Sequence, residues 1–450
     1  MPLPSFSRFL AGLLGLIAVN SWAWSNHTLA TYRALEPMPE LVAAAPVSVE
    51  PLESFLKTEE KAIETLLAQQ ENWARANVAA YAARPDKLAF RADPARTDAQ
   101  RRLDFLMALR VAPNSRFALY LQPDPREARG AGGVLRESAV STLPENANAA
   151  ETFVGIKAGD RVPALAVVAS ASDEPDYGLD INLWEDSPSD WGKQYGFGKL
   201  PFGNPSLSFS TQAPFHMGFY HQDWLIFKAA PFLKRTFPQL RVVQYSTLAS
   251  LAFRTGHPYW GWRFAGLALH YVQDLTQPYH ANLAPGDSSF RMISANTLAM
   301  AGWPRFKDEL VVLLSNRHLA LEKYQHDMML TAARARQDTA LEQALRNTRL
   351  DTHYPAWSDL YVRDVVAREA YAEGEKTVAV IVGAMPAGLV SDPAFDFGVK
   401  ENSLDLLAAM VQQDAGRRAA LDAQLAVLLG HFGAHSRNVL RGILQTSVKP

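Results

Sequence analysis

The sequence predicts an all-α protein built as a multi-helix bundle. Long segments carry apolar residues three and four positions apart with charged residues between them, which is the period of an amphipathic helix. Two histidines each precede an acidic residue by four positions, in His270–Asp274 and His318–Glu322, so each pair lies on one helix face. Two such pairs on two helices suit a metal cluster inside a bundle. Residues 338–450 also read as helical.

The composition excludes several classes of protein. The 450 residues include no cysteine, so neither disulfides nor thiolate chemistry is available. The net charge of -2 leaves no basic surface of the kind that binds duplex nucleic acid. An exported chain of this composition is held by core packing in place of disulfides, and bound metals are a further source of stability that the sequence leaves open.

The N-terminus has the pattern of a signal peptide. Arg8 precedes an apolar run over residues 9–19, and Ser21-Trp22-Ala23 supplies small residues at a cleavage site. The run of eleven residues is too short to span a bilayer. We therefore expect residues 1–23 to be removed and the protein to be secreted or periplasmic. An uncleaved anchor is the alternative.

The rest of the chain divides into predicted helices and loops. Four prolines in residues 36–52 predict a linker or loop. Helices are expected at 53–83, 97–111 (capped by Thr97 or Asp98), from about 158 to 173, at 222–253 with a break at Pro238, in the segment that ends at Asp274, and at 304–335.

A long loop over residues 182–215 is rich in glycine and proline and carries two Trp, one Tyr and four Phe. Long loops in compact domains are often functional. Its aromatic side chains either line a substrate groove, touch a lipid interface or fold back onto the core, and the sequence leaves these alternatives open.

The central motif is LALHYVQDLTQPYHANL, residues 267–283, which places three potential metal ligands within eleven residues. His270 and Asp274 share a helix face and reach a common point. Pro278 lacks an amide hydrogen, so it ends or bends the helix and His280 approaches from a turn. A buried core histidine would explain a lone HxxxD, but a third ligand-type residue after a forced turn favours a metal site.

Candidates upstream of this motif supply further ligand types. Asp176 belongs to an acidic cluster over residues 173–176, which is either a solvated helix end or the source of one carboxylate ligand. His216 and His221 follow in PFHMGFYHQDW, and at least one of them is placed to join the site.

Downstream, His318 and Glu322 form the second pair on a helix. His326, one turn further, is expected to support a ligand or to lie at the surface. His431 and His435 are also four apart, but no neighbouring carboxylate pair accompanies them, so we expect no metal there.

After removal of residues 1–23 the chain would start Trp24-Ser25-Asn26-His27. A freed α-amine binds a metal together with its own carbonyl oxygen, and His27 adds an imidazole nitrogen. From these residues alone, the alternative of a surface helix, HTLATYRAL, is favoured.

The candidates together predict a metal-dependent hydrolase. They are Trp24, His27, Asp176, His216 or His221, His270, Asp274, His280, His318 and Glu322. Imidazole and carboxylate ligands without sulfur suit catalytic zinc, and nine groups imply several ions. Zinc ions close together activate water and hold the attacking and leaving oxygens of a phosphate ester. No GxSxG or Walker-type loop points to another chemistry.

The pattern resembles the zinc-dependent phospholipase C and single-strand-specific nuclease superfamily, whose members share an all-helical fold and a trinuclear zinc site. HYVQDLTQPYHAN is similar to that family's HxxxDxxxxxH core. Trp24 matches the family's mature N-terminal Trp, which binds zinc through its amine and carbonyl, and His27 matches the first histidine. Asp176 resembles the early aspartate, and His216 matches the next histidine better than His221 does.

By this resemblance three zinc ions are expected. The first ion would be bound by Asp176, His216, His270 and Asp274. The second would be bound by His280, His318 and Glu322, and the last two of these match the family's closing HxxxE. The third would be bound by Trp24 and His27, with Asp274 bridging to the first ion.

The resemblance also implies the domain plan and the reaction. A zinc-dependent catalytic domain would cover residues 24–335 with an insertion around 36–150, and a helical extension over 336–450 would have no family counterpart. LTQPYHAN is closer to the phospholipase branch than to the nuclease branch. We therefore expect a phospholipase C that cleaves phospholipid headgroups with a zinc-activated water, which Asp176 orients or deprotonates. A transient contact with a membrane surface and no obligate protein partner are expected.

Three alternatives remain open at this point. The first is a zinc-dependent single-strand nuclease or nucleotidase, the second is another phosphoesterase, and the third is a non-catalytic secreted helical binding protein with a degenerate site.

Overall fold

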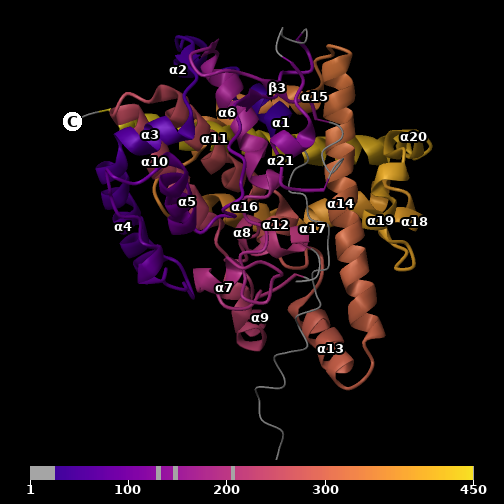
Figure 1. Cartoon of the computed structure of the whole chain (residues 1–450). Helices are drawn as coiled ribbons and strands as arrows, with labels where there is room; N and C mark the ends of the chain where they lie inside the picture. Colours follow the sequence, from indigo (N-terminus) through magenta and orange to yellow (C-terminus); the bar gives the residue numbers. More distant parts are fainter. Residues whose placement is uncertain (1–25, 128–132, 145–150, 204–207, 449–450) are drawn as a thin grey trace, which may run out of the picture.

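The computed structural model describes residues 26–127, 133–144, 151–203 and 208–448, and these residues are mostly helical (Figure 1). The all-α prediction is therefore confirmed. The described strands form two short antiparallel pairs, β1 (Val47–Ser48) with β4 (Arg161–Val162) and β2 (Tyr120–Leu121) with β3 (Val154–Gly155). Trp24 and the predicted signal peptide lie outside the described residues.

Helix α11 (Pro258–Asp274) lies at the centre of the core, and each of its residues from Tyr259 onward is buried. The helices that pack around it are α6 (Ala164–Asp173), α10 (Pro238–Arg254) and α21 (Ala415–Ser447). At Gly266 an added Cβ would lie 2.5 Å from the carbonyl oxygen of Val168, so only glycine allows α6 to approach this closely. This close packing brings the end of α6 beside His270.

Helix α1 (His27–Leu35) is buried along its whole length and packs against α6 and α21. The expectation of a surface helix is therefore wrong. The polar side chains of α1 have buried partners in place of water: Thr28 donates to the carbonyl oxygen of Ala169 at 3.0 Å, and Arg33 pairs with Asp124. Because distant segments supply these partners, residues 27–35 alone could not indicate the burial.

The region expected as an insertion contains four of the described helices: α2 (Pro39–Val42), α3 (Leu52–Thr58), α4 (Glu60–Asn77) and α5 (Asp98–Leu109). Thr97 caps α5 as predicted, because its side chain accepts a hydrogen bond from the Gln100 amide at 3.2 Å. The predicted helix over 53–83 is divided at Glu59, where α3 ends and α4 begins.

The aromatic loop over residues 182–215 includes the short helices α7 (Gly192–Tyr195) and α8 (Ala213–His216). Trp184, Phe197 and Phe215 are buried in a cluster of their own, with the rings of Phe197 and Phe215 5.3 Å apart. Of the three alternatives, these aromatic residues fold back onto the core.

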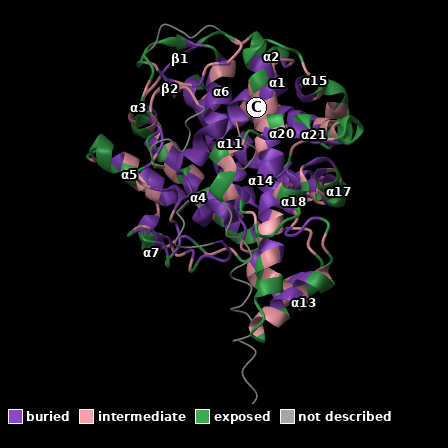
Figure 2. Ribbon diagram, turned by 90° about the vertical axis from the view of Figure 1, so that its right-hand side faces the viewer, coloured by how far each residue is buried: buried purple, intermediate pink, exposed green. Residues whose placement is uncertain are grey.

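The second half of the chain completes the bundle. Its remaining described α-helices are α9 (Trp224–Ala229), α12 (Pro278–Ala281), α13 (Ser289–Met300), α14 (Arg305–Arg334), α15 (Ala340–Arg346), α16 (Ala367–Ala372), α17 (Gly374–Ala384), α18 (Ala387–Val390), α19 (Phe397–Lys400) and α20 (Leu406–Val411). Figure 2 shows α13 and the adjoining part of α14 projecting beyond the body of the molecule. Among the described helices, even the longest lack the apolar stretch that a bilayer-spanning segment needs.

The C-terminal helices share the core of the rest of the molecule. Leu425 and Phe432 of α21 belong to the same buried cluster as Leu29 of α1 and Leu269 of α11. Figure 1 shows α21 crossing the molecule next to α1 and α11. The predicted domain boundary at residue 335 stays a prediction, and the packing makes α21 a support for the centre of the fold.

Candidate metal centre

Eight of the nine predicted ligands lie in three groups whose donor atoms could hold metal ions. The groups are His27, His270 and Asp274; Asp176, His216 and His270; and His280, His318 and Glu322. All eight residues are buried. The first two groups share His270, so we call them together the Asp274 cluster, and we call the third the Glu322 cluster. The ninth predicted ligand, Trp24, lies outside the described residues.

Asp274 lies between the first two groups and faces both. Its Oδ1 atom is 3.2 Å from Nε2 of His27, while its Oδ2 atom is 2.8 Å from Nδ1 of His216 and 3.3 Å from Nε2 of His270. Asp176 reaches the same place from the turn after α6, with Oδ1 3.7 Å from Nε2 of His270. A carboxylate whose two oxygens face different imidazoles has the arrangement of a bridging ligand.

Three histidines are oriented by contacts at the ring nitrogen that points away from the carboxylates. The Nδ1 contacts are His27 to Gln273 Oε1 at 2.8 Å, His270 to the Ser172 carbonyl oxygen at 2.7 Å, and His280 to the His216 carbonyl oxygen at 2.9 Å. Each oxygen accepts the Nδ1 hydrogen, which leaves Nε2 as the atom that could bind a metal. Such outer contacts fix the ring and tautomer of metal-binding histidines.

Several donor atoms of these clusters are buried without a hydrogen-bond partner. They are Nε2 of His27, His216 and His280, Oδ1 of Asp176 and Asp274, and Oε2 of Glu322. Buried polar atoms are normally satisfied, because an unpaired one costs free energy. A concentration of unsatisfied nitrogen and oxygen atoms at one place fits bound cations, and the donor set without sulfur fits zinc.

The Asp274 cluster is strongly charged. Burial opposes charge on His27, but the Asp274 carboxylate, with Oδ1 3.2 Å from Nε2, outweighs burial and raises the pKa of His27 to about 9. Burial is likewise outweighed at His216, where Asp180 and Asp274 raise the pKa to about 10. Burial would raise the pKa of Asp274, yet His270 and the other imidazoles hold that pKa well below its usual range. Cation binding therefore has to displace protons from imidazoles here.

Asp176, in the same cluster, behaves differently. Burial is the main cause that raises its pKa to about 7, against the opposing influence of His216 and His27. Its carboxyl group therefore exchanges a proton near neutral pH.

The Glu322 cluster is assembled from α14 and α12. Glu322 Oε1 lies 2.8 Å from Nε2 of His318 and 3.8 Å from Nε2 of His280. The ring of Tyr279 stacks on the ring of His318 at 5.2 Å and holds it in place. Pro278, expected to end the preceding helix, instead begins α12 after a short turn, and this places His280.

Burial keeps this second cluster close to neutral. It lowers the pKa of His280 to about 4 and that of His318 to about 3, and it raises the pKa of Glu322 to about 8. At neutral pH the Glu322 carboxyl group is mostly protonated, so a cation that binds here displaces that proton.

The tertiary structure selects among the other candidates. His216 joins the Asp274 cluster, whereas Nε2 of His221 lies 2.7 Å from the carbonyl oxygen of Arg363. In the acidic cluster, Glu174 pairs with Arg263 at 2.6 Å and Asp173 binds Gln122. Only Asp176 of that cluster belongs to a metal group.

The two remaining histidine candidates have other partners. His326 contacts its neighbour Asp327 at 3.1 Å. His431 and His435 both contact Glu369, at 3.3 and 2.9 Å, and neither belongs to the three groups found among the described residues.

Sequence reasoning missed the residues that support the ligands. Asp180 is buried, accepts hydrogen bonds from Tyr271 and Arg241 at 2.6 Å each, and lies 3.6 Å from Nε2 of His216. Gln273 orients His27, and Gln277 donates to Glu322 at 2.9 Å. The only signal was their position beside predicted ligands, which does not separate them from ordinary polar residues.

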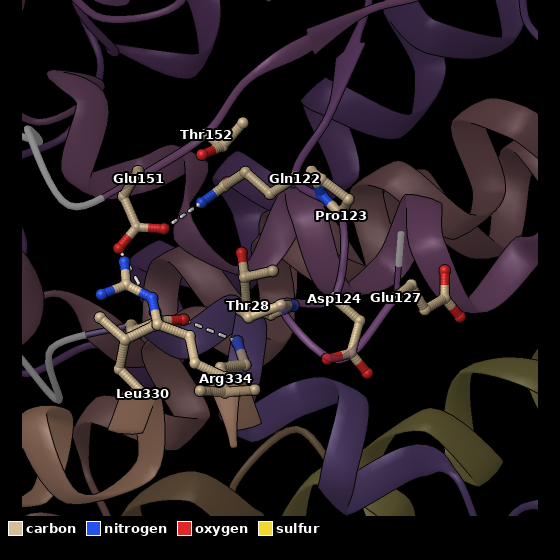
Figure 3. A pocket seen from close by; sticks show the side chains of 12 residues that line it. Thr28, Gln122, Pro123, Asp124, Glu127, Glu151, Thr152, Leu330 and Arg334 are labelled. Atoms are coloured by element: carbon tan, nitrogen blue, oxygen red, sulfur yellow. Dashed lines mark hydrogen bonds between the residues drawn. The ribbon is translucent and has the colours of Figure 1, made fainter. Parts of the chain in front are cut away.

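A polar pocket of about 220 Å³ lies beside the start of α1 (Figure 3). Thr28, the neighbour of His27, lines it together with Glu151 and Arg334. Glu151 accepts a hydrogen bond from Gln122 at 3.0 Å, and Gln122 also donates to Asp173 at 3.0 Å. The pocket therefore belongs to the polar surroundings of the Asp274 cluster, and its own carboxylates are not part of the metal groups.

Comparisons with protein-family models, with curated proteins and with solved structures found no match to this chain.

Proposed function

We propose that this protein is an exported zinc-dependent phosphodiester hydrolase, most similar in its action to a phospholipase C. One observation carries the proposal: Asp274 faces imidazoles on both sides at the junction of two metal groups, and a third group of the same donor types is formed by α12 and α14. Structural histidines in a core rarely leave so many donor atoms without partners.

The residues of the two clusters would hold the ions, and Trp24 would complete the set in a chain that begins there. Zinc at these positions supplies a Lewis acid that lowers the pKa of water and neutralises the charge of a phosphodiester. The buried helix α11 carries His270 and Asp274, and the end of α6 orients His270 through the Ser172 carbonyl oxygen, which limits reorganisation during the reaction.

Asp176 is the residue to which we assign proton transfer. Its Oδ1 atom is buried, has no hydrogen-bond partner and lies 3.8 Å from Nδ1 of His216. A carboxyl group with a pKa of about 7 accepts a proton from an attacking water near neutral pH. Cations on the neighbouring imidazoles would keep it ionised before the reaction.

The preference for a phospholipid is supported by the motif LTQPYHAN. Within it, Gln277 accepts a hydrogen bond from the Tyr279 amide at 2.6 Å and also contacts Glu322, so the segment orders the Glu322 cluster. The resemblance of this segment to the phospholipase branch is what places phospholipid ahead of nucleic acid.

A matched pair of variants on α14 tests the proposal. His318→Ala removes a donor of the Glu322 cluster, whereas His326→Ala removes a histidine two turns further along the same helix. We expect His318→Ala to lower the zinc content and to reduce hydrolysis of a chromogenic phosphocholine ester at least about 100-fold, because losing a ligand exceeds the effect of losing an outer contact. His326→Ala should keep both.

Zinc content is measured by elemental analysis, and hydrolysis is followed on the chromogenic ester, on phosphatidylcholine and on single-stranded DNA. A chain without zinc, or full activity in His318→Ala, would refute the metal assignment. Cleavage of DNA without hydrolysis of phosphatidylcholine would assign the protein to the nuclease branch.

A further inference from the structure

Large aromatic side chains are exposed on α9, on α13 and around the start of α14, and α13 contacts both of the other helices. Trp224 is 66%, Phe290 81%, Trp303 62% and Phe306 61% exposed. Helices α9 and α13 are in contact, and Figure 1 shows them together at one end of the molecule. We call these four residues and their helices the projecting tip. Four exposed large aromatic side chains on adjoining elements are unusual for a surface that faces only water.

The projecting tip carries more basic than acidic residues. Residues 224–235 contain Lys228, Lys234 and Arg235 and no acidic residue, and residues 288–307 contain three more basic residues and none that is acidic. The whole chain has a net charge of -2, so this concentration is local. Four acidic residues flank these segments, and two of them pair with arginines. Asp223 and Asp308 are at the borders, Asp287 pairs with Arg291 and Glu309 pairs with Arg305, so six basic residues face four acidic ones.

Two of the lysines accompany the aromatic rings directly. The Lys228 ammonium lies 5.7 Å from the centre of the Trp224 ring, and the Lys234 ammonium lies 5.1 Å from the centre of the Phe227 ring. Both lysines are exposed. Tryptophan with an adjacent lysine suits the level of lipid headgroups. The ring lies among the headgroups and the ammonium contacts their phosphates.

The tip is joined to the Glu322 cluster by one continuous helix, α14, and to the other candidate ligands by short connections. His318 and Glu322 lie on α14 itself, and His318 follows the start of that helix by 13 residues, or about 20 Å at a rise of about 1.5 Å per residue. Helix α13 begins nine residues after His280, and α9 begins eight residues after His216. A surface held at the tip is therefore fixed in orientation relative to the site.

We propose that the projecting tip docks on the surface of an anionic phospholipid membrane, with Trp303, Phe306 and Trp224 entering the headgroup layer. This inference rests on the proposed function, because a phospholipid substrate gives the protein a reason to dock on a membrane. The choice of surface rests on the exposure and charge of the tip residues. A second copy of the chain fits less well, because two basic tips would repel one another. Lipid phosphates match the charge, and the aromatic rings match the interface.

The test is co-sedimentation of the full chain with vesicles of phosphatidylcholine alone and of phosphatidylcholine with phosphatidylglycerol. We expect binding to the anionic vesicles that weakens with salt, and roughly fivefold weaker binding for each lysine replaced by glutamine at the tip. Trp303→Ser with Phe306→Ser should reduce binding about tenfold or more, because the apolar area that enters the membrane is lost.

The matched control is Val399→Ser with Val411→Ser, since these valines are 74% and 63% exposed on α19 and α20, away from the tip. The control should bind as the unchanged chain does, and both double variants should hydrolyse the soluble chromogenic ester at the unchanged rate. Equal vesicle binding by all three chains would overturn the proposal. The proposal would also be overturned if no chain sediments with vesicles while ultracentrifugation shows self-association that the Trp303→Ser, Phe306→Ser variant abolishes.

The two proposals fail in different ways. A chain that hydrolyses no phosphodiester but binds anionic vesicles through Trp303 and Phe306 supports the docking surface and refutes the proposed reaction. A chain that hydrolyses the soluble ester without binding vesicles refutes the docking surface alone.

Discussion

The Asp274 cluster and the Glu322 cluster use the same residue types and differ in charge. Both oxygens of Asp274 face imidazoles within 3.3 Å, so this carboxylate stays ionised and raises the pKa of His27 to about 9. Glu322 has one imidazole at 2.8 Å and the next at 3.8 Å, and burial dominates its pKa of about 8. The number of close partners, more than the type of residue, decides which buried carboxyl group is ionised.

This difference assigns a separate role to each cluster in the fold. The Asp274 cluster balances its own charge through imidazole–carboxylate contacts that join α1, α8 and α11. The Glu322 cluster is nearly neutral, so removing a side chain there leaves no unbalanced charge in the core.

Stability should respond most strongly at Asp274. Asp274→Ala leaves the protonated His27 buried without its nearest anion and takes one of two close anions from His216, and we expect a loss of about 3 to 5 kcal/mol in the free energy of unfolding. Glu322→Ala removes a mostly neutral group and should cost about 1 to 3 kcal/mol. Urea denaturation in the presence of a chelator measures both. Equal losses in the two variants would contradict the difference in charge.

Zinc binding should release protons, and the clusters should release different numbers. At pH 7.5 the pKa values of about 9 and 10 keep His27 and His216 protonated, and the value of about 8 keeps Glu322 mostly protonated. Saturating the unchanged chain with zinc should therefore release about three protons. Saturating the Glu322→Ala variant should release about two. An indicator dye in weak buffer counts them.

The same pKa values give the sign of the pH dependence. Zinc affinity should fall as the pH is lowered, because protons compete for the imidazoles. Without metal, the raised pKa values of His27 and His216 stabilise the fold fully below about 6.5, and this contribution is lost as the pH rises through about 9 and 10. Heating the chain at pH 7 and pH 9, with and without zinc, should show a larger zinc-dependent rise in Tm at pH 9. A constant rise would contradict the assigned protonation states.

The smallest expected effects concern the two glutamines that contact ligands. Gln273→Ala removes the acceptor of the His27 Nδ1 hydrogen, and Gln277→Ala removes the donor to Glu322. Each should weaken zinc binding about 10- to 100-fold, as is usual for outer contacts of metal ligands. Zinc titration against a competing chelator measures this. Gln273 also contacts Thr31 and Ser436, so its loss should lower stability as well. Unchanged zinc affinity in both variants would show that packing alone holds His27 and Glu322 in place.

Local patterns were sufficient for some features of the molecule. The apolar period predicted the helices, Thr97 predicted a cap, and the four-residue spacing predicted that His270 lies with Asp274 and His318 with Glu322. These features depend on residues within one or two helical turns of each other, so a short segment of sequence is enough to predict them.

Contacts between distant segments decided the rest. His216 and His221 are five residues apart in the same segment, and only the packing of α8 against α11 selects the former. The burial of α1 depends on partners such as Asp124, and the aromatic loop folds inward because Phe237, outside it, joins its cluster.

The sequence by itself determined the helical class, the types of candidate ligand and the two pairs spaced for a shared helix face, because periodicity and spacing act locally. Only the tertiary structure decided which histidines converge, which carboxyl groups are ionised and which aromatic residues remain exposed. These properties depend on distance and burial among residues far apart in the chain, and no short segment contains that information.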